Sequence, residues 1–115
     1  MAYITKDLHC VAVGGGAIGM QVWVYDTVDA IATVYAAGYI SDAGASVLGG
    51  RGMEKGDIVI LRRWTTAIPT TTAEKLTAAA VANVLVSTTI HMVIGISTAG
   101  AADLTDGLAI TITNT

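Results

Sequence analysis

Five segments rich in β-branched residues limit what this chain can fold into more than any other feature. Such side chains fit a pleated surface and are poor helix formers, so each segment predicts a strand. The fourth places Ile90 and Met92 on one face and His91 and Val93 on the other, with the two-residue period of a strand. The segments are LHCVAV (8–13), MQVWVYDT (20–27), GDIVILRRW (56–64), STTIHMVIGIS (87–97) and DGLAITIT (106–113).

Two further segments are candidates for short helices. Residues 73–85, AEKLTAAAVANVL, contain good helix formers, and Thr71 with Glu74 fits a capping box at their start. Residues 26–38, DTVDAIATVYAAG, have helical spacing and a glycine stop. Because threonine, valine and isoleucine dominate the second segment, helix and strand both remain open there.

The strands do not alternate regularly with helices, which argues against a doubly wound α/β fold. The pattern predicts a mainly all-β fold, an antiparallel β-sandwich or jelly-roll-like barrel with one or two short helices. The chain has 115 residues, enough for one domain with a core and too few for two, so we expect a single domain over 1–115.

The stretch VAVGGGAIG contains Gly14, Gly16 and Gly19 in the spacing G-x-G-x-x-G, so one alternative is a nucleotide-binding enzyme that uses this loop. A dinucleotide-binding turn opens a helix, but MQVWVYDT follows here and resists helix formation. An acidic residue is also needed about 20 residues further on. Asp29 comes too early and Asp42 too late. We therefore interpret the glycines as a connection between two strands and expect no enzyme.

Further kinds of chemistry receive little support. His9, Cys10 and His91 are too few and too scattered for a typical zinc site. Asp26 and Asp29 could form a carboxylate pair on a helix, but we favour a turn residue and a helix cap. Cys10 is the only cysteine, so no intrachain disulfide can form, and we expect it to be a small buried residue. We predict no catalytic residue, no cofactor and no metal.

The composition predicts association with other subunits. Apolar residues make up 53% of the chain and charged residues 13%, where about 25% is usual. A surface so poor in charge is expected to be partly covered by protein. The net charge of −3 and the six basic residues argue against nucleic acid as a partner.

One uncharged segment, 76–102, has the length of a membrane span. Polar residues in its middle argue against a span, and we expect no membrane partner; they are Asn83, Ser87, Thr88, Thr89 and His91.

Candidate contact residues lie in two places. Arg62, Arg63 and Trp64 follow one another, and arginine and tryptophan are enriched at interfaces. The N-terminal arm, with Tyr3, is the second candidate. The alternative for Trp64 is that its ring covers the end of the core.

From Trp23 to Leu61 the chain resembles small bacteriophage head decoration, cement and head-fibre proteins. The chain departs from that pattern at Ile40, where phenylalanine is common, and in the long loop GGRGMEKGD. The resemblance covers about a third of the chain, and it rests on Tyr25, Thr27, Asp29, Ala32, Val34, Gly38, Tyr39, Leu48, Gly56, Asp57 and Ile58.

The resemblance implies a structural virion protein that binds the outer surface of a phage capsid and clamps neighbouring subunits of the major capsid protein. It implies a homo-oligomer, with a trimer favoured over a dimer. The protein would be made in the host bacterial cytoplasm and reside on the capsid surface. A fibre or receptor-binding base component is the nearest alternative.

Overall fold

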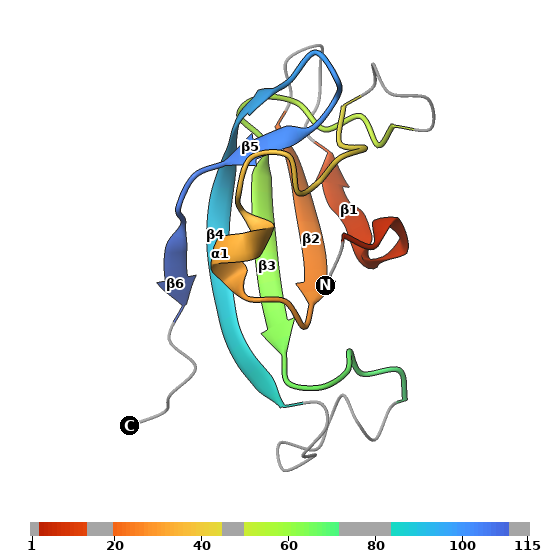
Figure 1. Ribbon diagram of the computed structural model, residues 1–115, viewed down its shortest axis with the longest axis vertical. Coiled ribbons are helices and arrows are strands. Elements are labelled where there is room, and N and C mark those ends of the chain that lie inside the picture. Colours follow the sequence, from red (N-terminus) through yellow and green to blue (C-terminus); the bar gives the residue numbers. More distant parts are fainter. Residues whose placement is uncertain (1–2, 14–19, 45–49, 72–83, 111–115) are drawn as a thin grey trace.

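The computed structural model describes residues 3–13, 20–44, 50–71 and 84–110. This part of the chain is mainly β, with six strands in one sheet (Figure 1). The only other regular elements in these ranges are the short 3₁₀ turn η1 (Thr5–Asp7) and the single-turn helix α1 (Ile31–Val34). The strands are β1 (Leu8–Val13), β2 (Gln21–Thr27), β3 (Ile58–Trp64), β4 (Leu85–Ile96), β5 (Ala102–Leu104) and β6 (Leu108–Ile110).

The strand order is β1-β2-β3-β4-β5, and β6 also pairs with β4. The prediction of an antiparallel sheet is wrong for one pair, because β2 and β3 run parallel. Parallel neighbours need a long crossover, and residues 28–57 provide it by returning the chain to the end of the sheet where β2 begins. The remaining four pairs are antiparallel.

The helix predicted over 26–38 is much shorter in the structure. Only Ile31–Val34 is helical, and Asp26 and Thr27 complete β2. Ala30 is the N-cap residue and makes no side-chain capping bond, so the role of helix cap assigned to Asp29 is wrong. β-branched residues lower helix propensity, which favours the short element. The helix predicted over 73–85 falls mostly outside the described residues, and Leu85 begins β4.

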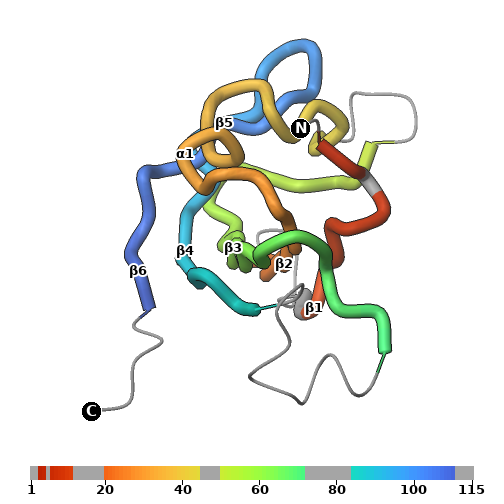
Figure 2. The backbone as a smooth tube through the Cα atoms, turned by 60° about the horizontal axis from the view of Figure 1, so that its bottom comes forward, coloured from red at the N-terminus to blue at the C-terminus, as the bar shows by residue number. Residues whose placement is uncertain are grey.

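The hydrophobic core lies on one face of the sheet, called here the covered face. Trp23 and Tyr25 from β2 and Val59 and Leu61 from β3 point into it. Figure 2 shows α1 and the crossover on one side of the sheet, where their buried apolar residues pack against the strands. The remaining buried members of the cluster are Leu8, Val34, Ile40, Ala43, Met53, Val93, Ala102 and Leu104.

The alternation predicted in β4 is present, and the side that holds His91 and Val93 is the buried one. The His91 ring packs against Tyr35, with 5.4 Å between ring centroids. Its Nδ1 lies 2.7 Å from the carbonyl oxygen of Thr105, and its Nε2 lies 2.6 Å from Oγ1 of Thr89. Because a carbonyl can only accept, Nδ1 carries a proton and donates to Thr105.

Asp57 ties the end of the crossover to β2. Its buried carboxylate accepts hydrogen bonds from the backbone and side-chain nitrogens of Gln21, from Nε1 of Trp23 and from the backbone nitrogen of Glu54. Gly56 precedes it with φ 92°, and β3 begins directly afterwards at Ile58. Lys55 and Gly56 thus form the turn that leads through Asp57 into β3.

Cys10 is exposed, so the prediction of a buried cysteine is wrong. β1 is an edge strand of the sheet, and its residues His9 and Val11 are exposed as well. Cys10 lies on the same side of the sheet as Leu8, which is fully buried, and the layer that covers Leu8 does not reach Cys10.

Candidate functional site

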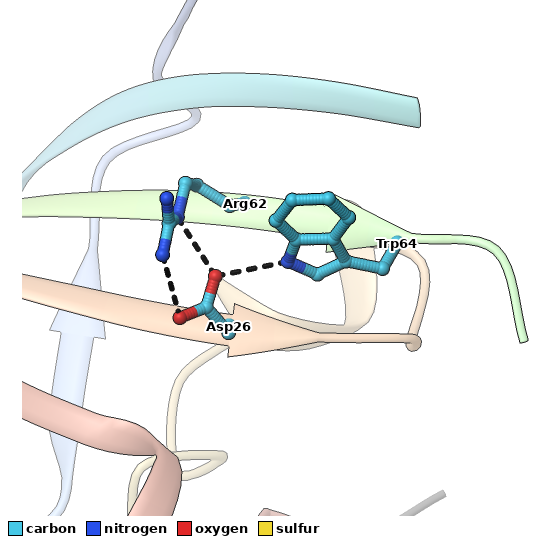
Figure 3. A network of polar contacts seen from close by, with 3 residues as sticks. All are labelled: Asp26, Arg62 and Trp64. Atoms are coloured by element: carbon cyan, nitrogen blue, oxygen red, sulfur yellow. Dashed lines mark hydrogen bonds and ion pairs between the residues drawn. The ribbon is translucent and has the colours of Figure 1, made fainter. Parts of the chain in front are cut away.

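An arginine, a tryptophan and an aspartate form one cluster on the face of the sheet opposite the core (Figure 3). Nε and Nη2 of Arg62 donate to the two carboxylate oxygens of Asp26, at 2.7 and 2.9 Å. Nε1 of Trp64 donates to Oδ1 of the same carboxylate at 2.9 Å. The guanidinium also lies over the indole ring, 5.6 Å from its centroid.

The backbone of β2 and β3 sets this geometry. Asp26 and Arg62 are register partners in the parallel pair, so their side chains leave the sheet side by side. Trp64 lies two residues beyond Arg62 on the same strand and therefore points to the same face. A register shift between Arg63 and Trp64 in the pairing with β4 marks the end of the regular ladder.

The cluster is ordered, and its charged arginine remains accessible. The side chain of Asp26 is 13% exposed and that of Arg62 is 43% exposed. Because both carboxylate oxygens are already engaged, Asp26 serves to orient Arg62 and Trp64. An arginine and an indole held in fixed positions lose little conformational entropy when they bind, which suits them to anchor a protein contact.

A cleft of about 720 Å³ adjoins the cluster. Its apolar lining includes Ile4, which precedes η1, and Ile68 and Pro69, which follow β3. Charged side chains also line the cleft, so it can accept a segment that carries both apolar and charged side chains. The remaining lining residues are Lys6, Asp7, His9, Asp26, Arg62, Trp64 and Thr70.

Of the four contact residues predicted from the sequence, the structure brings Arg62 and Trp64 together. Arg63 points to the covered face, and its buried Nε finds no hydrogen-bond partner among the described residues. Tyr3 also lies on that side, where it is half-buried and donates to Oδ1 of Asp42 at 2.6 Å. A role of Arg63 and Tyr3 in contacts remains a prediction.

The role of Asp26 is one that sequence reasoning misses. The sequence predicts a turn residue or a partner of Asp29, but the two carboxylates have different surroundings. Asp26 engages Arg62 and Trp64, whereas Asp29 is buried and accepts a 2.6 Å hydrogen bond from the Tyr39 hydroxyl. The even spacing of Asp26 along a strand that also carries Val22 and Val24 is the signal that could have found it.

The tyrosine cluster beneath the crossover is structural. The rings of Tyr3, Tyr25 and Tyr39 contact one another, with centroids 5.5 to 6.0 Å apart. Burial raises the pKa of the Tyr39 hydroxyl well above its ordinary value, and the hydrogen bond to Asp29 adds to the rise. The neutral phenol is therefore the form that this site stabilises.

The glycine loop has strands on both sides. β1 ends at Val13, β2 begins at Gln21, and the two pair antiparallel. A strand thus stands where a dinucleotide-binding turn requires a helix. Residues 14–19 themselves lie outside the described part of the chain.

The uncharged segment 76–102 contains strand β4, which spans residues 85–96. None of the helices within the described ranges has the length and apolar character needed to cross a bilayer.

His91 lies apart from His9 and Cys10. His91 is buried in β4, whereas His9 and Cys10 are exposed on β1. Within the described ranges, no group of three metal-ligating side chains gathers.

Comparison of the chain with models of protein families, with curated proteins and with solved structures finds no match. The geometry of the site and the resemblance noted in the sequence are the two supports for a function.

Proposed function

We propose that this chain is a structural protein of a phage virion that binds the outer surface of the capsid and clamps neighbouring subunits of the major capsid protein. The observation that carries the proposal is the Asp26–Arg62–Trp64 cluster beside its cleft. Arginine and tryptophan dominate the binding energy of many interfaces, especially where they are held in position before binding.

The residues that carry the resemblance to decoration and head-fibre proteins support the same proposal. The hydroxyl of Tyr39 hydrogen-bonds to both Tyr25 and Asp29 beneath the crossover, and Asp57 anchors the end of the crossover to β2. They stabilise the scaffold and leave the opposite face for contacts. A resemblance at these positions is expected among proteins that share a scaffold and bind different capsids.

The mechanism is thermodynamic. A protein that binds the closed shell and not its free subunits stabilises the shell by RT ln(1 + [L]/Kd), about 2.7 kcal/mol at one hundred times Kd. Many copies act together on a symmetric shell, and linked copies gain avidity. No covalent chemistry is needed.

In this proposal the protein is a homo-oligomer made in the host bacterial cytoplasm and resident on the capsid surface. The sandwich or jelly-roll-like barrel predicted from the sequence needs a second layer over the face of the sheet opposite the core. A neighbouring copy would provide that layer. Tyr3 and Arg63 are proposed as secondary contacts, nearer the crossover.

A fibre or receptor-binding base component is the second candidate, and the cleft favours it over a nucleotide-binding enzyme. The indole can pack against the ring of a saccharide, and the neighbouring charged groups can form hydrogen bonds with the saccharide's hydroxyls. Binding of host-surface glycans without binding to capsids would select this candidate.

The test uses particles of the phage that encodes the chain, prepared with and without the protein. Particles that carry it should survive heating or osmotic shock that opens particles lacking it, and adding purified protein back should restore resistance. Arg62→Ala and Trp64→Ala should fail to restore it. Lys55→Ala, which removes an exposed cation in a turn before β3, should restore it fully. Equal resistance of the two kinds of particle would reject the proposal.

A further inference from the structure

The face of the sheet opposite the core, called here the open face, is apolar and exposed. Ile90 is 36% exposed, Met92 45% and Leu108 77%. Their neighbours on β2 and β3 are half-buried. The apolar members of the open face in β2, β3, β4 and β6 are Val22, Val24, Ile58, Ile60, Ile90, Met92, Ile94, Leu108 and Ile110.

The strand register aligns these side chains in two rows. One row runs from Val24 through Ile60 and Ile90 to Leu108, and each step is a register pair. The adjacent row runs from Val22 through Ile58 to Met92. Neither row contains a charged residue. The result is a continuous apolar surface across four strands.

A sheet face that water covers normally carries polar side chains, in alternation with the apolar residues of the core face. Here the open face of β3 and β4 carries Ile58, Ile60, Ile90 and Met92 where polar side chains would be expected. Large exposed apolar surfaces on soluble chains mark contacts with other proteins. Among the described residues, α1 and the crossover lie on the covered face and leave the open face to another partner (Figure 2).

We propose that a second copy of this chain covers the open face with its own open face, so that two sheets pack into a sandwich about a two-fold axis. Permanent homodimer interfaces are more apolar than those formed with transient partners. An exposed apolar face favours association as soon as the chain has folded. Other copies of the same chain are made at the same time and place. The inference concerns self-association and does not depend on capsid binding.

Charge favours this arrangement. In a two-fold contact each face meets itself, so an unpaired charge would face its own copy. The next row lies two residues further along β2 and β3 and contains Asp26 and Arg62. These two residues form an ion pair and neutralise each other within one chain. This pair lies beside the apolar rows, at one end of the open face, where it stays available for another contact.

The size of the face fits a modest contact. With strands about 4.8 Å apart and side chains on one face about 6.8 Å apart, the two apolar rows across four strands cover roughly 20 by 14 Å. Two such faces remove about 560 Å² from water, which is smaller than a standard specific interface and fits a dimer that forms reversibly at micromolar concentration. Sheets that pack in this way lie about 10 Å apart with strands near −30°.

The test is the mass of the purified full-length chain in solution, measured by light scattering and sedimentation over a range of micromolar concentrations. We expect the mass of two chains of 11.7 kDa. Ile90→Lys should give a folded monomer with an apparent Kd at least about 100-fold weaker, because a charge at the centre of the contact would be desolvated. Thr33→Lys, on the exposed side of α1, should remain a dimer.

A second measurement covers the case in which Ile90→Lys fails to fold. In a Cys10→Ser background, Ile90→Cys should form a disulfide-linked dimer under mild oxidation, and Thr33→Cys should not. A wild-type monomer, a trimer, or a dimer that tolerates a charge at Ile94 and at Ile90 would overturn the inference. A monomer that still protects capsids would overturn it and leave the proposed function intact.

Discussion

Nε1 of Trp23 donates a hydrogen bond of 3.1 Å to the buried carboxylate of Asp57. Trp23 belongs to β2, and Asp57 is the last residue of the crossover before β3. This contact joins β2, near the start of its parallel pairing with β3, to the end of the crossover 28–57. The crossover is the segment that allows β2 and β3 to run parallel. Stability of the fold should therefore depend on a carboxylate that has no part in the proposed binding surface.

Replacing that carboxylate by an amide should destabilise the fold strongly. In Asp57→Asn one oxygen becomes an NH₂ group that faces donors, so at least one buried hydrogen bond is lost. We expect a loss of about 3 kcal/mol in the free energy of unfolding. Urea denaturation followed by tryptophan fluorescence measures it. Asp103→Asn, on the exposed side of β5, should change stability by less than about 0.5 kcal/mol.

Gly107 and Gly56 provide a matched pair of substitutions. Both have positive φ, 90° and 92°, but a Cβ at Gly107 would lie 2.4 to 2.8 Å from ring atoms of His91, whereas nothing lies within 4 Å of one at Gly56. Gly56→Ala should cost about 1–2 kcal/mol from backbone strain alone. Gly107→Ala should cost about 3–4 kcal/mol, because the ring must also move. Equal midpoints of the two variants in thermal unfolding would contradict the close packing of Gly107 against the His91 ring.

Alkaline pH should unfold the protein in part through Tyr39. Its pKa is raised in the folded state, so the folded chain favours the neutral phenol more than the unfolded chain does. That stabilisation is complete below the ordinary pKa of about 10 and is lost as pH rises above it.

Tyr39→Phe separates this effect from the rest of the alkaline transition. At neutral pH it should cost about 1–2 kcal/mol, because the buried carboxylate of Asp29 loses the hydrogen bond that Tyr39 donates. Above pH of about 10 its stability should fall less steeply than that of the wild type, since phenylalanine cannot ionise. Urea titrations at several alkaline pH values compare the two slopes, and parallel slopes would exclude Tyr39 as the titrating group.

Asp26 should matter for binding more than for folding. Its ion pair is partly exposed, so Asp26→Asn should change the free energy of unfolding by less than about 1 kcal/mol. If Asp26 orients Arg62 and Trp64, affinity for capsids should fall about tenfold or more. Cosedimentation with undecorated particles measures the affinity. Asp103→Asn makes the same charge change on β5 and should bind as the wild type does.

Local chemistry made most of the strands predictable. Val22, Val24, Ile58 and Ile60 lie in runs of β-branched residues, and such side chains fit the pleated, half-buried surface of a sheet. The turn before Ile58 was predictable for the same reason, because glycine and aspartate favour turns wherever they occur. The helix over 26–38 was not, because a single turn depends on what packs against it.

The sequence by itself determined that the chain is mainly β, where most of its strands lie, and that it is poor in charged residues. These properties arise from side-chain shape and solvation, which act residue by residue. Only the tertiary structure decided that β2 and β3 run parallel, that His91 lies inside while Ile90 lies outside, and that Asp26 reaches Arg62. Those outcomes depend on the path of the crossover over one face of the sheet. That path makes register partners of residues far apart in the sequence, such as Asp26 and Arg62, which no local sequence pattern can predict.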